Sequence, residues 1–177
     1  MEKFQNRYRI PSARAAWWDY SSPGKYFITI CTAFRECIFG KITDKRMILS
    51  EAGKIVLQEW IKSFKIRSEL SCDTFVIMPN HLHAILCIGA SSEVTDIKTP
   101  IENHGVAYRS PKSISSFVGG FKSAATTRIN ELRKTPYAPV WQTRFHDHII
   151  RDETEYQRIY WYIRNNPKNW KEDKFHH

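Results

Sequence analysis

The chain has 177 residues, of which 42% are hydrophobic and 14% aromatic, so it can bury a sizeable core as one domain, and this composition argues against disorder. Lysine and arginine number 27 against 18 aspartates and glutamates, which gives a net charge of +9. This excess favours a polyanionic partner, most simply nucleic acid, over an acidic or neutral small substrate.

Residues 1–12 are polar and basic and lack the apolar segment of a signal peptide, and no stretch approaches the ~18 apolar residues that a membrane span needs. Four cysteines are present without a C-x-x-C pair, and three of them lie in apolar runs where cysteine behaves as a small hydrophobe. These features predict a cytoplasmic protein with reduced thiols and no membrane partner. The cysteines are Cys31, Cys37, Cys72 and Cys87.

In chain order, residues 1–23 form a basic and aromatic arm that ends in a turn. Residues 25–33 are rich in β-branched and aromatic side chains and predict a strand, to which residues 37–42 would add a short partner. Ser50 can cap a helix that ends near Arg67, with Ile48 and Leu49 leading in. Its apolar residues recur at helical spacing, and they are Val56, Leu57, Trp60, Ile61 and Phe64.

Two β-rich runs, residues 72–78 and 82–88, are separated by Pro79-Asn80 and predict an antiparallel hairpin. From residue 89 to residue 112 the chain turns polar and irregular, which indicates a long surface loop. Residues 113–134 then predict a helix, and residues 140–151 are extended in character. A last helix begins at Asp152, with Glu155 reaching back to complete the cap, and ends at Asn166-Pro167. One domain over residues 24–170 and a tail over residues 171–177 are therefore expected.

Two groups of side chains offer nucleic-acid contacts. Lys122, Arg128 and Arg133 lie on the predicted helix over residues 113–134, where they can contact phosphates, although a solvated basic helix face explains them equally well. Trp17 and Trp18 could stack unpaired bases, or could equally belong to the core.

The most informative motif is His81-Leu82-His83, which follows the turn at Pro79-Asn80. In a strand, residues two apart point to the same face, so both imidazoles would share one face while Leu82 points to the core. Such a pair can hold a divalent ion. Because proline belongs at the first residues of a strand, we expect the histidines near a strand start, at a sheet edge that a substrate can reach. The alternative is a chance pairing of ordinary core or surface histidines.

Helical geometry separates three tyrosines of the last helix. At roughly 100° per residue, Tyr156 and Tyr160 fall on the apolar stripe and are expected in the core. Tyr162 lies at the border between core and solvent, where its hydroxyl could be held firmly and still be reached, so it is the better nucleophile. Asn166, four residues later, would lie on the same side and could complete a coordination shell. Without the histidine pair, Tyr162 and Asn166 would be a surface aromatic and a helix terminator.

At these residues the chain resembles the single-tyrosine HUH transposases, and among them the REP-associated tyrosine transposases. The matching segments follow the family's order and cover most of the chain, and their combination is highly specific. They are residues 26–30, 76–83, 120–124, 141–145, 147–151 and 162–167. The loop over residues 89–112 departs from compact members of the family.

The resemblance implies an α+β fold, in which helices pack on an RRM-like, or ferredoxin-like, antiparallel sheet. It implies His81 and His83 as metal ligands, Asn166 as a further ligand and Tyr162 as the nucleophile. The implied ion is Mg²⁺ or Mn²⁺, whereas two imidazoles by themselves would suggest a softer metal such as Zn²⁺. The candidates for DNA binding are Lys122, Arg128, Arg144 and Arg151.

A second H-x-H motif, His146-Asp147-His148, would also place two imidazoles on one face of a strand. We rank it below the first pair because the resemblance keeps His148 but places no metal there.

The implied activity is that of a metal-dependent endonuclease and strand transferase for single-stranded DNA, acting on REP-like hairpins through a 5′-phosphotyrosine. Tyrosine suits transfer because a phenol of pKa ~10 is a good leaving group, so a DNA hydroxyl can reseal the strand. Two alternatives remain: a domesticated protein that binds hairpins without cutting, and a phosphoesterase that releases free products. We expect a monomer, with a dimer as the alternative.

Overall fold

The structure is a computed structural model that describes residues 3–4, 7–8, 21–89 and 112–176. The proposed stacking residues Trp17 and Trp18 and nearly all of the loop expected over residues 89–112 lie outside these ranges. Two short strands, β1 (Lys3–Phe4) and β2 (Arg7–Tyr8), pair with each other.

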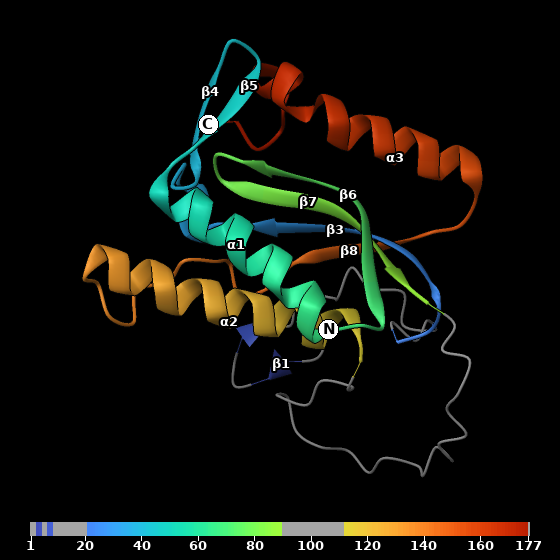
Figure 1. Ribbon diagram of the computed structural model, residues 1–177, viewed down its shortest axis with the longest axis horizontal. Coiled ribbons are helices and arrows are strands. Elements are labelled where there is room, and N and C mark those ends of the chain that lie inside the picture. The colour runs from blue at the N-terminus through green and yellow to red at the C-terminus, as the bar shows by residue number, and fades with distance from the viewer. Residues whose placement is uncertain (1–2, 5–6, 9–20, 90–111, 177) are drawn as a thin grey trace.

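A four-stranded antiparallel sheet forms the centre of the molecule (Figure 1). Its strands are β3 (Gly24–Cys31), β6 (Leu70–Met78), β7 (His81–Ile88) and β8 (His146–Ile150), in the order β6-β7-β3-β8. The expected hairpin is therefore confirmed as β6 and β7. The prediction that the histidine pair lies at a sheet edge is wrong, because β3 pairs with β7 along its whole length, from Cys31 opposite His81 to Gly24 opposite Ile88.

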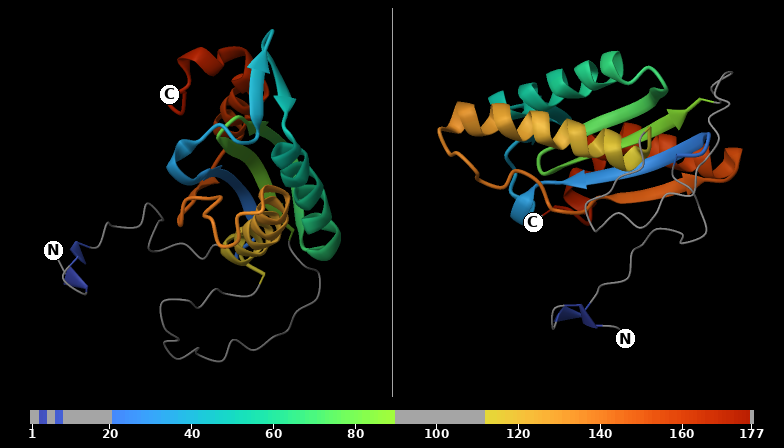
Figure 2. Two further views of the ribbon diagram at one scale, coloured as in Figure 1. Left: turned by 90° about the vertical axis from the view of Figure 1, so that its left-hand side faces the viewer. Right: turned by 90° about the horizontal axis from the view of Figure 1, so that it is seen from below.

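Helices cover both faces of the sheet, as Figure 2 shows. One face carries α1 (Glu51–Ile66) and α2 (Ile114–Arg133), and the other carries α3 (Glu153–Asn165), which continues as the 3₁₀ helix η2 (Asn166–Glu172). A second 3₁₀ turn, η1 (Ala33–Arg35), follows β3. This is the α+β architecture expected from the resemblance.

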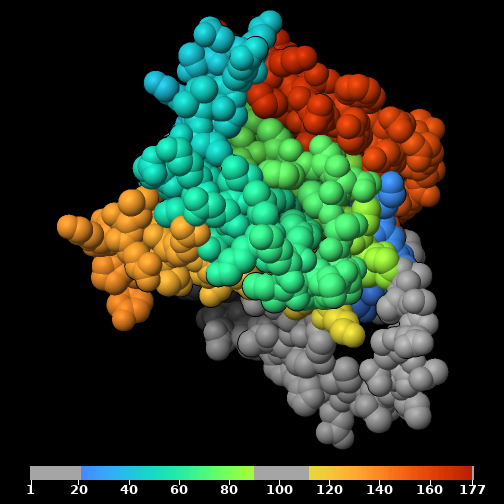
Figure 3. Space-filling view, viewed as in Figure 1, coloured from blue at the N-terminus to red at the C-terminus, as the bar shows by residue number. Residues whose placement is uncertain are grey.

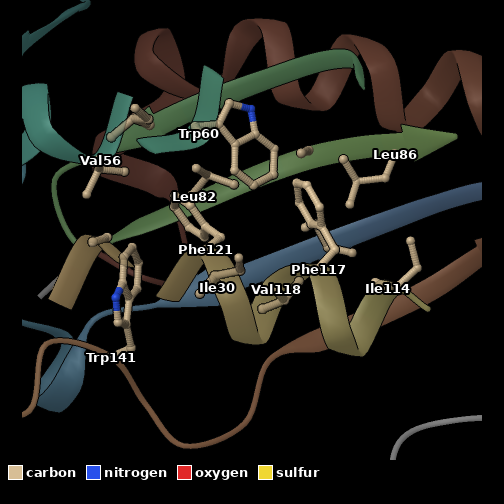
Figure 4. Close-up of a cluster of buried hydrophobic side chains, with 14 of the residues drawn as sticks. Ile30, Val56, Trp60, Leu82, Leu86, Ile114, Phe117, Val118, Phe121 and Trp141 are labelled. Atoms are coloured by element: carbon tan, nitrogen blue, oxygen red, sulfur yellow. The ribbon is translucent and has the colours of Figure 1, made fainter. Parts of the chain in front are cut away.

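The main core lies between the sheet and the pair α1 and α2 (Figure 4). The Trp60 ring packs edge-on against Phe121 and Phe117, with ring centroids 5.0 and 5.5 Å away. Leu82 is fully buried in the same cluster. Because side chains alternate along β7, Leu82 in this core directs its two histidine neighbours to the face under α3, as predicted.

A smaller core joins α3 to the sheet through Ile85, Ile159 and Ile163. Tyr156 and Tyr160 pack against this cluster but are only half-buried, so the prediction of core positions holds for their contacts and overstates their burial.

The predicted helix starts are confirmed by their caps. Ser50 Oγ accepts a hydrogen bond from the Gly53 N–H at 3.1 Å, and Asp152 Oδ1 accepts one from the Glu155 N–H at 2.8 Å. The Glu155 carboxylate reaches back to the N–H of Arg151, one residue earlier than a capping box requires.

Residues 37–42 were expected to add a strand beside residues 25–33, but β4 (Gly40–Thr43) pairs instead with β5 (Arg46–Leu49), in a separate hairpin that sequence reasoning missed. Ile48 and Leu49 directly precede the Ser50 cap as expected, and they are the last two residues of β5. The two turn residues, Asp44 and Lys45, adopt positive φ angles of 50° and 61° without glycine, so the usual sequence signal of this tight turn is absent. Ile61, which was assigned to the apolar face of its helix, is about half exposed, at 50%.

Candidate active site

The tight turn between β6 and β7 fixes the histidine pair. His81 opens β7 and pairs with Met78 across the two-residue turn, and His83 follows on the same face. The two imidazole centroids are 4.4 Å apart, and the two residues are 0% and 1% exposed. The shared face predicted from the H-x-H spacing is therefore present.

Helix α3 brings Tyr162 to this pair across the sheet. The Tyr162 hydroxyl lies 3.2 Å from Nε2 of His83, and the residue is 40% exposed. The Phe27 ring on β3 packs beside both rings, with its centroid 5.3 Å from that of His83 and 6.3 Å from that of Tyr162. The border position predicted for Tyr162 thus places its hydroxyl beside the imidazoles.

Asn166 lies at the junction of α3 and η2, where it joins the site as expected from its spacing. Its Nδ2 donates a hydrogen bond to Oδ2 of Asp173 at 2.8 Å. The same carboxylate oxygen accepts from the Tyr162 hydroxyl at 3.4 Å. One ligand atom from each of His81, His83 and Asp173 falls within 4.8 Å of the others.

Sequence reasoning missed Asp173. It lies in the segment assigned to the tail, among other charged residues, and no spacing relates it to the histidines. The sequence signal was limited to its chemistry, since carboxylates are common ligands of hard cations.

Each imidazole is oriented by a hydrogen bond at Nδ1. Asn80 donates through Nδ2 to the carbonyl oxygens of Arg35 and Phe175, at 3.1 and 2.7 Å, so its Oδ1 is the atom that accepts from His81 Nδ1 at 2.9 Å. Thr29 Oγ1 lies 2.8 Å from His83 Nδ1. These contacts leave both Nε2 atoms as the ones that can hold an ion, an arrangement typical of metal-binding histidines.

Burial sets the protonation of the site. It lowers the pKa of His81 to about 4, with Lys174 and Arg35 acting in the same direction against the opposing charge of Asp173. Burial, followed by the proximity of His81, holds the pKa of His83 well below its ordinary value. Both imidazoles are therefore neutral near pH 7, as metal ligands must be. Burial and then the Asp173 charge raise the pKa of Tyr162 to about 12, so its phenol is protonated.

Two buried atoms indicate that a cation fits here. Among the described residues, His81 Nε2 and Asn166 Oδ1 are buried without a hydrogen-bond partner, which is uncommon and costly in a folded protein. Together with His83 Nε2 and the Asp173 carboxylate, they form a set of nitrogen and oxygen donors. Amide and carboxylate oxygens are ligands suited to Mg²⁺ and Mn²⁺, so the residues present fit the divalent ion that was predicted.

The segment after α3 covers the histidines. The Phe175 ring centroid lies 4.6 Å from that of His81 and 5.8 Å from that of His83, and the Trp170 ring packs 6.0 Å from His81. The C-terminal residues and the β4–β5 hairpin lie against each other in the space-filling view (Figure 3). The expectation that a substrate reaches the histidines directly is therefore wrong for this conformation, in which both imidazoles are buried.

The second H-x-H pair, His146 and His148 on β8, does not form a comparable site. His146 is exposed, and His148 Nε2 lies 2.8 Å from Oε1 of Glu155 on α3. Within the described ranges, the His81, His83 and Asp173 group is the one set of at least three such side chains with metal-ligand spacing.

The four basic candidates divide into two groups. Lys122 Nζ donates to the carbonyl oxygens of Gln142 and Thr143, at 2.6 and 3.2 Å. Arg128 donates to the Glu59 carboxylate and to the Gln58 side chain, both at 2.7 Å. Lys122 and Arg128 thus bond to other parts of the protein. Arg144 and Arg151, just before and just after β8, are exposed.

None of the helices in the described part of the chain has the length and apolar character needed to cross a membrane.

Comparisons with known proteins agree with this fold. No protein-family profile matches the chain. A Haemophilus influenzae protein named only as uncharacterized is 36% identical over 171 residues, covering 93% of this chain and 92% of its own length. A second H. influenzae protein, described as a REP-associated tyrosine transposase, is 22% identical over 174 residues, covering 89% and 83% of the two chains. The solved structure of a REP-associated tyrosine transposase bound to a REP hairpin matches with a TM-score of 0.62 and 19% identity, covering 93% of this chain and 77% of that one.

Proposed function

The chain belongs to one family with the first of these H. influenzae proteins and is similar to the REP-associated tyrosine transposases, and from this premise we propose that it cleaves and rejoins single-stranded DNA. The proposed substrate is a hairpin formed by a REP-like palindrome, and the proposed intermediate is a 5′-phosphotyrosine on Tyr162. One observation carries the proposal: the Tyr162 hydroxyl lies 3.2 Å from a buried imidazole whose neighbours offer further metal ligands.

His81, His83 and Asn166 are the proposed metal ligands, and Asp173 joins them because its carboxylate lies within the same cluster. The proposed ion is Mg²⁺ or Mn²⁺. When bound, it would polarise a non-bridging oxygen of the scissile phosphate and offset its negative charge.

Tyr162 is the proposed catalytic nucleophile. Its oxygen forms a bond to phosphorus while the bond from phosphorus to the 3′ oxygen breaks, and the departing 3′ oxygen takes a proton from solvent to give a free 3′-hydroxyl on the other DNA end. The raised pKa of Tyr162 means that its proton must leave as the new bond forms. Asp173 Oδ2, which already accepts a hydrogen bond from this hydroxyl, is placed to take the proton. Helix α3 and the Phe27 contact hold the phenol in place.

The same residues can carry out the reverse reaction, which rejoins the DNA strand. A 3′-hydroxyl that attacks the phosphotyrosine restores the phosphodiester, and the phenol leaves and regains its proton. We propose that the protein acts in this way as a monomer.

Lys122, Arg128, Arg144 and Arg151 remain the proposed DNA contacts. The exposure of Arg144 and Arg151 supports their role, since their side chains reach solvent beside the strand that adjoins Phe27. Lys122 and Arg128 would contribute through charge while keeping their internal hydrogen bonds.

A second candidate function is hairpin binding without cleavage. The burial of His81 and His83 beneath Phe175 favours it, because a phosphate cannot approach the imidazoles unless the covering segment moves.

Hairpin DNA labelled at either end and incubated with Mn²⁺ tests the proposal. A covalent adduct that forms with the wild type and with Tyr160→Phe, but not with Tyr162→Phe, supports strand transfer. Tight binding with no cleavage of any tested hairpin supports the second function, and cleavage that survives Tyr162→Phe supports a phosphoesterase.

A further inference from the structure

The η1 turn after β3 exposes a large aromatic side chain that the proposed chemistry does not use. Phe34 is 83% exposed, between buried Ala33 and half-buried Arg35. A single exposed hydrophobic residue is common on protein surfaces and does not by itself indicate a function. The evidence for a function of Phe34 comes from its backbone conformation and its neighbours.

The backbone of this turn is strained. Phe34 has a φ of 53° and Arg35 a φ of 57°, so two successive residues with side chains adopt the left-handed conformation that favours glycine. The surrounding structure holds them there: the Thr32 hydroxyl donates to the Glu36 carbonyl at 2.9 Å, and the Ala33 N–H donates to the Val140 carbonyl at 2.9 Å. Such strain persists where neighbouring contacts impose it, and it is concentrated at functional sites.

The strained turn is tied to the candidate active site. Asn80 donates to the Arg35 carbonyl and accepts from His81 Nδ1 through the other end of the same amide. The Arg35 guanidinium lies 5.3 Å from the Phe175 ring centroid, and that ring covers His81. The Phe34–Arg35 turn is therefore held beside the site by hydrogen bonds that also orient a proposed metal ligand.

The charge beside Phe34 identifies the kind of partner. The Arg35 guanidinium and Lys174 Nζ lie 5.3 and 5.0 Å from the centroid of the Phe175 ring, so two cations stand beside this turn on a chain of net charge +9. An exposed aromatic ring beside cations is the arrangement with which proteins hold unpaired nucleotides, because the ring stacks on a base while the cations contact the phosphates.

We propose that the Phe34–Arg35 turn binds an unpaired nucleotide next to the scissile phosphate, with the base stacked on Phe34 and the backbone phosphate near Arg35. This inference rests on the proposed function, because it assigns the single-stranded part of that substrate to a place on the protein.

Binding measurements on hairpins with and without unpaired flanks test the inference. In a Tyr162→Phe background, Phe34→Ala and Phe34→Gly are expected to weaken binding of the flanked hairpin about 5- to 150-fold and to leave the blunt hairpin unaffected. Phe34→Gly relieves the left-handed strain, so its melting temperature should equal or exceed that of the parent protein, which separates lost binding from lost folding. Tyr137→Ala is the matched control, because Tyr137 is 98% exposed and also has a positive φ, of 66°.

A direct readout is photo-cross-linking with 5-iodouracil placed at successive positions of the unpaired strand. One position should cross-link to Phe34, as mapped by mass spectrometry. Unchanged binding of flanked DNA by both Phe34 variants overturns the inference, as does equal weakening by Tyr137→Ala. Loss of self-association in place of DNA binding would also overturn it, by assigning the ring to a second copy of the chain.

The outcomes also separate this inference from the proposed function. Wild-type protein that forms the tyrosine adduct while Phe34 variants bind normally refutes the inference alone. Protein that binds an unpaired oligonucleotide through Phe34 but cleaves no hairpin upholds the inference and refutes the cleavage.

Discussion

The Tyr162 hydroxyl and Nε2 of His83 lie 3.2 Å apart, although the two residues are 79 positions apart in the chain. Helix α3 spans the face of β6 and β7, and Ile159 and Ile163 anchor it to Ile85 of β7. The phenol is thus positioned by hydrophobic packing before any ion binds.

Manganese should stabilise the wild-type protein through the histidine cluster. At a concentration 100-fold above the dissociation constant, binding adds about 2.7 kcal/mol to the free energy of unfolding, which corresponds to a rise in melting temperature of roughly 5–10 °C. His81→Gln should abolish this rise, whereas His148→Gln should keep it. The Mn²⁺ electron paramagnetic resonance signal measures the bound ion directly. Loss of binding in His148→Gln alone would assign the ion to the His146 and His148 pair.

Removing the hydroxyl that orients His83 should weaken the metal site. Thr29 is 4% exposed, so Thr29→Val keeps the shape of the side chain but leaves His83 Nδ1 without its partner. The expected cost is about 1–3 kcal/mol in stability and a 10- to 100-fold loss of Mn²⁺ affinity. Thr127→Val on α2 is the control, since its hydroxyl bonds only to a carbonyl of its own helix among the described contacts. Equal Mn²⁺ affinities of the wild type and Thr29→Val would contradict the prediction.

Metal-free protein should lose stability as the pH falls below about 6.5. The pKa of His81 is about 4 in the folded chain against an ordinary value of 6.5, so between these values the unfolded chain binds more protons. Stability is therefore fully present above pH 6.5 and decreases toward pH 4, by about 2 kcal/mol between pH 7.5 and pH 5 for His81 alone. His83 acts in the same direction.

Urea unfolding in EDTA at the two pH values measures this effect. His81→Gln should show a smaller decrease than the wild type. Glu69 and Glu155, whose lowered pKa values start from 4.5, contribute below that pH and do not interfere at pH 5. Identical decreases in wild type and variant would show that His81 is not held neutral.

The salt dependence of hairpin binding should depend on Arg144 and Arg151. Each alanine substitution is expected to reduce the slope of log affinity against log salt concentration by about 1, because one fewer counterion is released. Arg128→Ala should in addition cost about 1–3 kcal/mol in stability, since the nearly buried Glu59 carboxylate would lose its guanidinium partner. Slopes unchanged in both Arg144→Ala and Arg151→Ala would place the phosphate contacts elsewhere.

Local patterns in the sequence were sufficient to predict several features. The H-x-H spacing predicted a shared face because strand alternation is set by backbone geometry alone. Ser50 and Asp152 predicted helix starts because capping depends on a single side chain and its neighbours. The angular position of Tyr162 on its helix separated it from Tyr156 and Tyr160, whose rings pack against the smaller core.

Other features depend on contacts between distant segments and left no local signal. Asp173 enters the site because it follows η2, whereas sequence reasoning placed it in a tail over residues 171–177. The burial of the histidines depends on Phe175, and the internal pairing of Arg128 depends on a glutamate of another helix. The positive φ angle of Phe34 is imposed by hydrogen bonds of Thr32 and Ala33, and a phenylalanine in the sequence does not predict it.

The central claim is tested most directly by identifying the residue that becomes attached to DNA. Wild-type protein incubated with hairpin DNA and Mn²⁺ can be denatured, digested with trypsin and nuclease, and analysed by tandem mass spectrometry. The nucleotide adduct is predicted on Tyr162, within the peptide over residues 159–164 that also contains Tyr160. Cleaved DNA with no modified tyrosine, or an adduct on Tyr160, would contradict the account.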